Sequence, residues 1–286
     1  MTHPVEDHRP PPAAGFPSGG RQAEEQPAAP FRFRAQGPAG VLVLHGFTGV
    51  PFSVRPWGRA VHEAGAEVVG PLLPGHGTRW EDLAAVRWEQ WRDCAAEHLH
   101  ELRARHDVVV VCGLSMGGAL ALHLAALLPV DGVVALNPAL SLVSRTARLA
   151  PALHRAVPSV AGVGDDISVP GVTEHAYPRT PVAGVAELGR LMARTRKLLP
   201  AVTAPVLVLR SRRDHVVSDA SHGHVLRHTG GDVELVRLTE SFHVATLDRE
   251  ADVVNARTVR FVDDLVGGRN PVTAVARGAA RPGAGR

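Results

Sequence analysis

The sequence predicts an α/β fold in which a mostly parallel central sheet is flanked by helices. Between residues 31 and 266, short β-branched runs alternate with amphipathic helical stretches, the order expected of strands joined by crossover helices. The β-branched runs are apolar at nearly every position, as strands buried on both faces should be. With 286 residues, 45% of them apolar, the chain can bury one large core of this kind.

Candidate strands occur in order along the chain, each short, apolar and followed by a loop containing Gly, Pro, Asp or Ser. They are residues 41–44, 67–69, 108–112, 133–136, 206–209 and 233–238. After the first of them a helix is expected to begin near Ser53, because Val54, Trp57 and Val61 recur at helical spacing. Gly65 would end that helix.

The alternation of strands and helices stops between residues 141 and 179, where Pro and Gly divide the chain into five or six short segments. A structureless stretch of this length is uncommon inside a compact domain, so we expect an insertion that forms a small cap of short helices. The cap would lie above the carboxyl edge of the sheet and shape a substrate pocket there. The helix that returns from it is expected to run from about Val182 to Leu199.

Both ends of the chain read as disordered tails, residues 1–30 and 267–286, because they hold much Pro, Ala and Gly and little to bury. The C-terminal tail carries four arginines and no acid, so the positive net charge lies there and the domain between the tails is nearly neutral. We therefore expect no nucleic-acid partner.

Neither a signal peptide nor a membrane span is visible, and Cys94 and Cys112 belong to no ligand cluster. These features favour a cytoplasmic protein without metal or cofactor, and the oligomeric state stays open.

Ser115 is the candidate nucleophile. It lies in the turn Gly113-Leu114-Ser115-Met116-Gly117-Gly118, between an expected strand and an expected helix. A strained turn of this kind exposes the Ser Oγ above the sheet, and side chains at positions 113 and 117 would collide with neighbouring backbone. The alternatives are an ordinary glycine-rich turn or a phosphate-binding loop, but the latter would require Lys or a longer glycine run.

A serine hydroxyl needs a base to remove its proton and an acid to orient that base. In chains with this serine turn the acid and the base follow in the order Ser, Asp or Glu, His. Five histidines lie far enough along the chain: His215, His222, His224, His228 and His243. We select His243, because His222, His224 and His228 fall on an expected helix and His215 adjoins the best acid.

Asp214 is the candidate acid, because it follows the strand 206–209 and has Val216 and Val217 behind it to exclude water. The alternative role for Asp214 is a turn aspartate that hydrogen-bonds its own backbone. Asp219 is the rival acid, although its position suits a helix N-cap better.

Backbone N–H groups that bind the oxygen anion formed during acyl transfer contribute about 3 to 4 kcal/mol each. We assign this oxyanion hole to Phe47, in the turn that Gly46 allows, and to Met116, at the start of the helix after Ser115. His45 is interpreted as structural.

These motifs closely resemble bacterial carboxylesterases and monoacylglycerol lipases of the α/β-hydrolase superfamily, over roughly residues 33–266. The matching segments are His45-Gly46-Phe47-Thr48-Gly49, Pro74-Gly75-His76-Gly77, the serine turn, Arg210-Ser211, Asp214-His215-Val216-Val217 and residues 241–248. The resemblance implies an α/β-hydrolase fold with a small helical cap inserted after its sixth strand. It also implies the triad and oxyanion hole named above, and monoacylglycerols or short to medium acyl esters as small-molecule substrates.

The expected reaction is hydrolysis of a carboxylic ester through an acyl-enzyme on Ser115. A serine at this turn argues against the dehalogenase and epoxide hydrolase branches, which use a carboxylate nucleophile. Two alternatives stay open: the same triad acting on thioesters, lactones or carbon–carbon bonds, and a non-catalytic ligand-binding protein with this fold.

Overall fold

The computed structural model describes residues 26–144, 146–162 and 164–272. A seven-stranded sheet has the order β1-β3-β2-β4-β5-β8-β9, and every neighbouring pair is parallel except β1 with β3. The strands are β1 (Phe31–Phe33), β2 (Ala39–Leu44), β3 (Glu67–Gly70), β4 (Val108–Leu114), β5 (Gly132–Leu136), β8 (Val206–Ser211) and β9 (Val233–Leu238). The mostly parallel α/β fold predicted from the sequence is confirmed.

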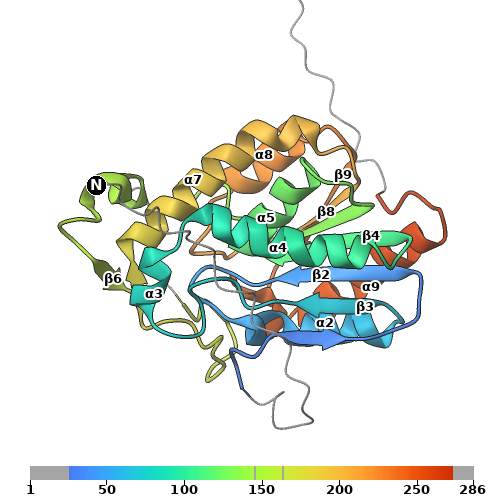
Figure 1. Ribbon diagram of the computed structural model, residues 1–286, viewed down its shortest axis with the longest axis horizontal. Helices are drawn as coiled ribbons and strands as arrows, with labels where there is room; N and C mark the ends of the chain where they lie inside the picture. The colour runs from blue at the N-terminus through green and yellow to red at the C-terminus, as the bar shows by residue number, and fades with distance from the viewer. Residues whose placement is uncertain (1–25, 145, 163, 273–286) are drawn as a thin grey trace, which may run out of the picture.

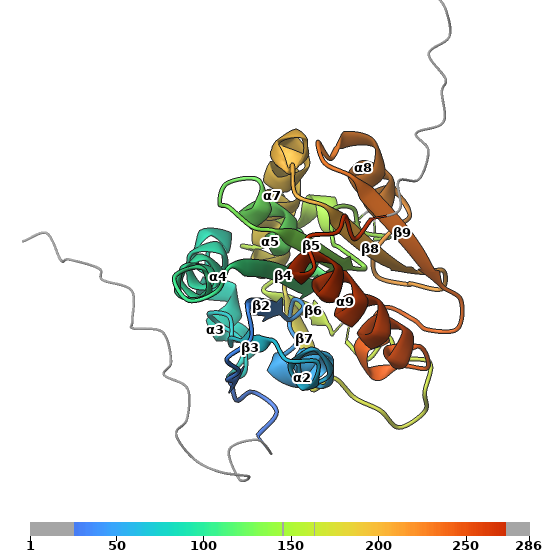
Figure 2. The ribbon, with the colours of Figure 1, turned by 90° about the vertical axis from the view of Figure 1, so that its right-hand side faces the viewer.

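Helices cover both faces of this sheet (Figure 1, Figure 2). One face packs against α2 (Arg55–Glu63) and α9 (Ala251–Val266), whose apolar side chains share a core with β2, β4, β5 and β8. The other face packs against α4 (Trp88–Arg103), α5 (Met116–Ala125), α7 (Val182–Leu198) and α8 (Ala220–His228). Burial on both faces explains why the central strands are uniformly apolar.

The segment between β5 and α7 forms the cap. It contains the short helices η2 (Thr146–Leu149) and α6 (Ala150–Leu153) and the antiparallel strands β6 (Ser159–Ala161) and β7 (Arg179–Pro181). The expectation of helices alone was therefore incomplete, since a two-stranded sheet closes the insertion. Five strands of the described chain precede it, so in this numbering the cap follows the fifth strand and not a sixth.

The cap begins beside the carboxyl end of β8. Leu142 forms an isolated bridge with Val217, and the N–H of Ser218 donates to the carbonyl of Ser141 at 2.9 Å. The helix α3 (Trp80–Ala85) packs against α7 and β7, and the 3-10 turn η1 (Pro51–Val54) packs against α2 and β2. Two further 3-10 turns are η3 (Leu199–Ala201) and η4 (Ala245–Leu247).

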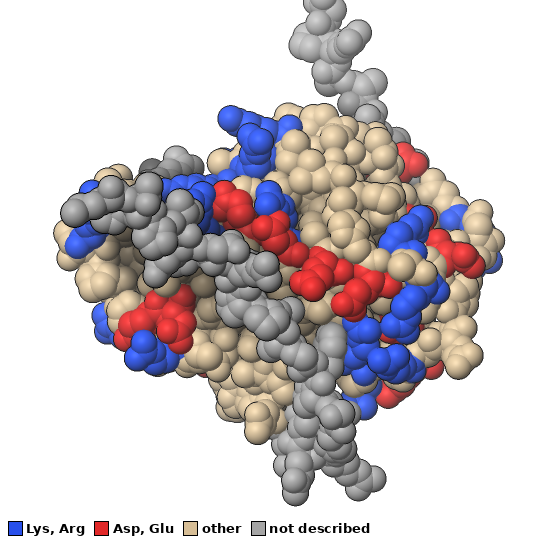
Figure 3. Space-filling view, viewed as in Figure 1, with Lys and Arg blue, Asp and Glu red and all other residues tan. Residues whose placement is uncertain are grey.

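Most of the two predicted tails lies outside the described residues, which leave out 1–25 and 273–286. The described end of the N-terminal tail contacts the domain, because the N–H of Phe52 donates to the carbonyl of Pro27. Within the described ranges, no helix is both long and apolar enough to span a bilayer. On the face shown in Figure 3, acidic and basic side chains are interspersed and form no broad basic surface.

Candidate active site

Ser115 lies at the tight turn between β4 and α5, with φ 57° and ψ −114°. A Cβ on Gly113 would lie 2.2 Å from the backbone of Gly117, and a Cβ on Gly117 would lie 2.2 Å from the carbonyl oxygen of Leu44. Real Cβ atoms do not approach backbone so closely, so glycine is required at both positions. The turn thus holds Ser115 in a left-handed conformation that costs free energy and that the surrounding backbone imposes.

The loops after β8 and β9 bring Asp214 and His243 together, although 29 positions separate them. Nδ1 of His243 lies 2.8 Å from Oδ2 of Asp214, and both side chains are buried. The other oxygen of Asp214 accepts the backbone N–H groups of Val216 and Val217, at 2.9 and 2.8 Å. The carboxylate therefore has a fixed orientation toward the imidazole.

The remaining acid and base candidates take no part in this buried contact, although His215 lines the cavity that Ser115 and His243 also line. Asp219 occupies the N-cap position of α8, and its side chain is 84% exposed. His222, His224 and His228 lie on α8, as the sequence predicted. His215 is 63% exposed and contacts Asp166.

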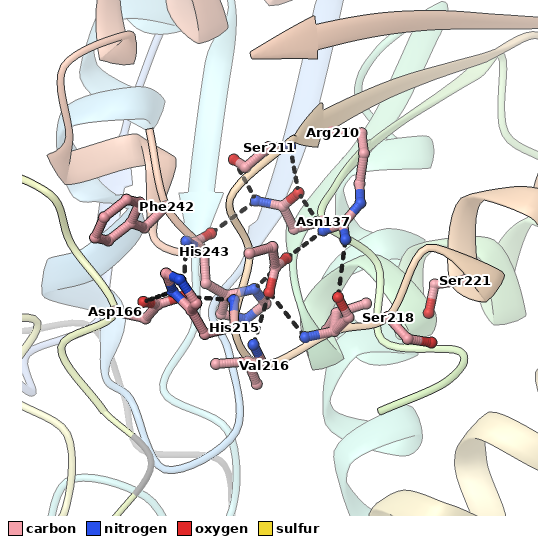
Figure 4. Close-up of polar contacts among 12 residues, drawn as sticks. Asn137, Asp166, Arg210, Ser211, His215, Val216, Ser218, Ser221, Phe242 and His243 are labelled. Carbon is pink, nitrogen blue, oxygen red and sulfur yellow. Dashed lines mark hydrogen bonds and ion pairs between the residues drawn. The ribbon is translucent and has the colours of Figure 1, made fainter. Parts of the chain in front are cut away.

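Arg210, which Figure 4 shows near Asn137, lies near the end of β8. It is the buried cation beside Asp214. Its Nη1 contacts the Asp214 carboxylate, and its Nη2 donates to the carbonyl of Val217 at 2.8 Å. Burial on its own raises the pKa of Asp214. The charge of His243, hydrogen bonds from His243 and Val217, and the charge of Arg210 together outweigh burial and hold that pKa below its usual value.

The loop after β2 lies next to Ser115, because a Cβ on Gly46 would be 3.5 Å from the Cβ of Ser115. Nε2 of His45 accepts the N–H of Leu73 at 3.1 Å, so its Nδ1 carries the proton and donates to the Gly46 carbonyl at 2.9 Å. Burial lowers the pKa of His45 to about 4, so the ring is neutral at neutral pH. His45 thereby anchors the peptide that joins Gly46 to Phe47.

Ser115 and His243 line one cavity of about 280 Å³. Its far wall comes from the cap and from α7, and most of that wall is apolar, including Leu153, Val157, Val160, Val182, Val185 and Leu188. Phe47 and Thr48 line it on the side of the sheet. A cavity with one apolar wall and a serine at its base suits a substrate that has an apolar chain and a polar reacting group.

Glu174 is the one carboxylate in the described lining of this cavity. Its Oε1 accepts the N–H of Asp165 at 3.1 Å. Burial raises the pKa of Glu174 to about 7, and the charges of Asp165 and Asp166 act in the same direction, while the Asp165 hydrogen bond and the charge of His243 oppose them. Near neutral pH the protonated form of this carboxyl group is therefore accessible, and that form can both donate and accept a hydrogen bond.

Sequence reasoning missed Asn137, Asp166 and Glu174, and it named Arg210 only as part of a motif. Asn137 and Arg210 carry a usable signal, because each is a polar residue at the carboxyl end of a buried strand that neighbours the serine strand or the acid loop. Asp166 and Glu174 belong to the cap, where no periodic pattern distinguishes an inward acid from an exposed one.

A family model described as serine aminopeptidase, S33, matches residues 36–250. The thermostable monoacylglycerol lipase of Bacillus sp. (strain H-257) is 38% identical over 238 residues, which cover 82% of this chain and 94% of that protein. The carboxylesterase of Bacillus subtilis (strain 168) is 29% identical over 82% of this chain and 96% of its own length.

A solved structure reported for the metagenome-derived lipolytic enzymes LipS and LipT is also similar. It superposes with a TM-score of 0.80 at 36% identity and covers 83% of this chain and 98% of its own. Sequence and structure agree, and the chain belongs to the serine aminopeptidase S33 family of α/β-hydrolases.

Proposed function

We propose that the protein hydrolyses carboxylic esters, with Ser115 as nucleophile, His243 as general base and Asp214 as the acid that orients the base. The observation that carries the proposal is the buried 2.8 Å contact between His243 and Asp214 at a cavity that Ser115 also lines. Relatives named monoacylglycerol lipase and carboxylesterase support the ester as substrate.

In the first half of the reaction the Oγ of Ser115 attacks the ester carbonyl carbon while His243 takes the hydroxyl proton. The carbonyl oxygen becomes an anion, which the backbone N–H groups of Phe47 and Met116 would bind. When the C–O bond to the alcohol breaks, His243 returns the proton to the leaving oxygen. Asp214 keeps the imidazole in the tautomer that these transfers need and stabilises its charged form.

In the second half, water replaces the alcohol. The water oxygen attacks the acyl carbon while His243 takes a proton from the water. This second intermediate then breaks its bond to the Oγ of Ser115, His243 returns the proton to that oxygen, and the carboxylic acid is released.

An ester fits the cavity better than a peptide with a free amino terminus, the substrate that the family description suggests. An aminopeptidase must hold an ammonium group beside the scissile bond, and a buried ammonium group needs several anionic or carbonyl partners. Within the lining that the structure describes, Glu174 is the single carboxylate, and burial raises its pKa to about 7. The apolar wall suits an acyl chain, and a carboxyl group whose pKa is raised by burial can hydrogen-bond an alcohol.

Fluorophosphonate labelling tests the proposal most directly, because such a probe reacts only with an activated serine. We expect one label per chain, on the peptide that contains Ser115, and hydrolysis of a p-nitrophenyl acyl ester. Ser115→Ala should abolish the label and lower kcat by about 10⁶ if the three side chains act as a unit. A loss below tenfold would exclude Ser115 as the nucleophile, and an unlabelled wild-type protein would favour a non-catalytic role. If the protein hydrolysed an acyl thioester or a lactone faster than the p-nitrophenyl ester, that compound class would replace the ester as the proposed substrate.

We further propose that the alcohol half of the substrate is a polyol such as the glycerol of a monoacylglycerol, with Glu174 as its hydrogen-bond partner. Glu174→Leu should lower kcat/KM for a monoacylglycerol about tenfold more than for the methyl ester of the same fatty acid, the effect of one hydrogen bond of about 1.4 kcal/mol. Glu174→Gln is the matched control, because its amide still donates and accepts, and it should preserve the ratio. An equal fall for both esters would show that Glu174 does not recognise the alcohol.

A further inference from the structure

The backbone of His243 is held at both of its polar groups by side chains from distant segments (Figure 4). Its carbonyl accepts the Nδ2–H of Asn137 at 2.8 Å, and its N–H donates to Oδ2 of Asp166 at 3.2 Å. Asn137 follows β5 and is fully buried, whereas Asp166 belongs to the cap. The residue that carries the imidazole is therefore fixed from the sheet on one side and from the cap on the other.

The Asp166 carboxylate also contacts the loop that carries Asp214. Its Oδ2 accepts the backbone N–H of His215 at 3.1 Å, and its Oδ1 lies 2.7 Å from Nδ1 of the His215 ring. One side chain of the cap thus joins the loop after β8 to the loop after β9. The hydrogen bond between Asp214 and His243 runs between the same two loops, so Asp166 acts as a second connection between them.

Neighbouring cap residues reinforce this connection. The N–H of Val244 donates to the backbone carbonyl of Asp166 at 3.1 Å. Ser168 donates its N–H to Oδ2 of Asp248 at 2.8 Å, and the same oxygen accepts the N–H of Phe242, also at 2.8 Å. The cap segment 166–168 is hydrogen-bonded to the histidine loop 242–248 on both sides of His243.

We propose that Asp166 is a positioning residue for the reaction: it acts through the backbone of His243 to hold the imidazole between Asp214 and Ser115. This inference rests on the triad proposed above. A general base must stay within hydrogen-bond reach of the proton it removes, and a displacement of about 1 Å can cost about 10² in rate. Without the Asp166 carboxylate the N–H of His243 would lose its partner. Among the described residues, Asn137 and Asp214 would remain as the side chains that hydrogen-bond His243 itself.

A second carboxylate in the same loop supplies a matched control. Glu250 accepts the backbone N–H groups of Thr239, Glu240 and Ser241, each at 2.9 Å. It therefore holds the same loop by the same kind of bond but does not contact the His243 backbone. A purely structural role for Asp166 predicts equal effects of the two carboxylates on activity, whereas a positioning role predicts that only Asp166 affects kcat.

The experiment compares the wild-type protein with Asp166→Ala, Asp166→Asn, Asp166→Glu and Glu250→Ala. Hydrolysis of p-nitrophenyl acetate gives kcat and KM, and the rate constant for fluorophosphonate labelling reports serine activation without a substrate. We expect Asp166→Ala to lower kcat and the labelling rate 10- to 100-fold with KM changed less than about threefold. Asp166→Asn should keep kcat and the labelling rate within about threefold of wild type, because its amide oxygen can still accept the N–H of His243.

Glu250→Ala should lower Tm but keep kcat within about threefold. Asp166→Glu keeps the negative charge but moves the carboxylate by about one carbon–carbon bond. If the alanine variant does not fold, this variant distinguishes a positioning role from a structural one. A fivefold or larger loss of kcat at unchanged KM in the glutamate variant supports positioning.

Three results would overturn the inference: wild-type kcat in a folded Asp166→Ala or Asp166→Glu variant, no recovery in Asp166→Asn, or an equal loss in Glu250→Ala. A wild-type protein that neither hydrolyses esters nor takes the label would instead refute the proposed function. The two failures are therefore distinguishable.

Discussion

At the scale of single residues, the two aspartates that contact Arg210 can be told apart by substitution. Asp214 is buried and contacts His243, while Asp219 is exposed and contacts Arg210. Asp214→Asn should lower kcat by about 10³ to 10⁴, because an amide that donates to the imidazole favours the wrong tautomer. Asp219→Asn should change kcat less than about threefold. Steady-state kinetics on one p-nitrophenyl ester measures both, and the reverse ranking would transfer the acid role to Asp219.

The sequence indicated Ser115, Asp214 and His243 because their order and their places after strands follow from local patterns. Asn137 and Arg210 could be recognised as polar residues at the ends of buried strands, but the sequence could not indicate which groups they contact. Asn137 and Arg210 meet because Leu136 pairs with Leu209 in the parallel register, which places the next residue of each strand side by side. Register between strands some seventy positions apart depends on the packing of the whole sheet and leaves no local signature.

At the scale of elements, the long buried strands were predictable and the short cap elements were not. The central strands are apolar runs bounded by turn residues, and they were found within one or two residues. The missed strand β1 has three residues, and so do β6 and β7. Three residues are too few to show a period, and pairing between β6 and β7 decides their structure.

The helix α7 allows a stability test, because it contains two glycines in contrasting surroundings. Gly189 is exposed, and a Cβ there would meet nothing within 4 Å, whereas a Cβ on Gly184 would lie 2.9 Å from the ring of Phe47. Gly189→Ala should raise the free energy of unfolding by about 0.5 to 1 kcal/mol, since alanine loses less backbone entropy in a helix. Gly184→Ala should raise the free energy of unfolding by less than this, or lower it. Urea unfolding measures both, and equal gains would contradict the close contact with Phe47.

At the scale of the whole molecule, the parallel sheet explains why remote residues share one site. The segments that carry Phe47, Ser115, Asn137, Asp214 and His243 each follow the carboxyl end of a parallel strand, and these ends meet at one edge. The alternation of strands and helices predicted this edge, and the insertion after β5 predicted a cap above it. The cytoplasmic location and the disordered character of the two tails stay predictions.

Stability of the whole molecule should fall on mild acidification, because buried histidines must stay neutral. Burial lowers the pKa of His45 to about 4, and burial with the neighbouring charge of His45 lowers the pKa of His76 to about 3. In the unfolded chain both would titrate near 6.5. Below pH 6.5 the unfolded state therefore binds more protons than the folded state, and each of these two histidines should cost about 2 kcal/mol between pH 7 and pH 5. His98 and His123 also have lowered pKa values and act in the same direction.

Glu174 opposes this trend, which makes the prediction specific. Burial raises its pKa to about 7, above the usual value of 4.5, so between these pH values the folded state binds more protons at this site than the unfolded state. Acidification from pH 7 to pH 5 should therefore recover about 2 kcal/mol that the buried carboxylate costs at neutral pH. Urea unfolding at pH 7 and pH 5 should show a net loss of at least about 2 kcal/mol in the wild-type protein. Glu174→Gln removes the compensating titration and should make the loss about 2 kcal/mol larger; an equal or smaller loss would show that Glu174 is ionised in the folded protein at pH 5.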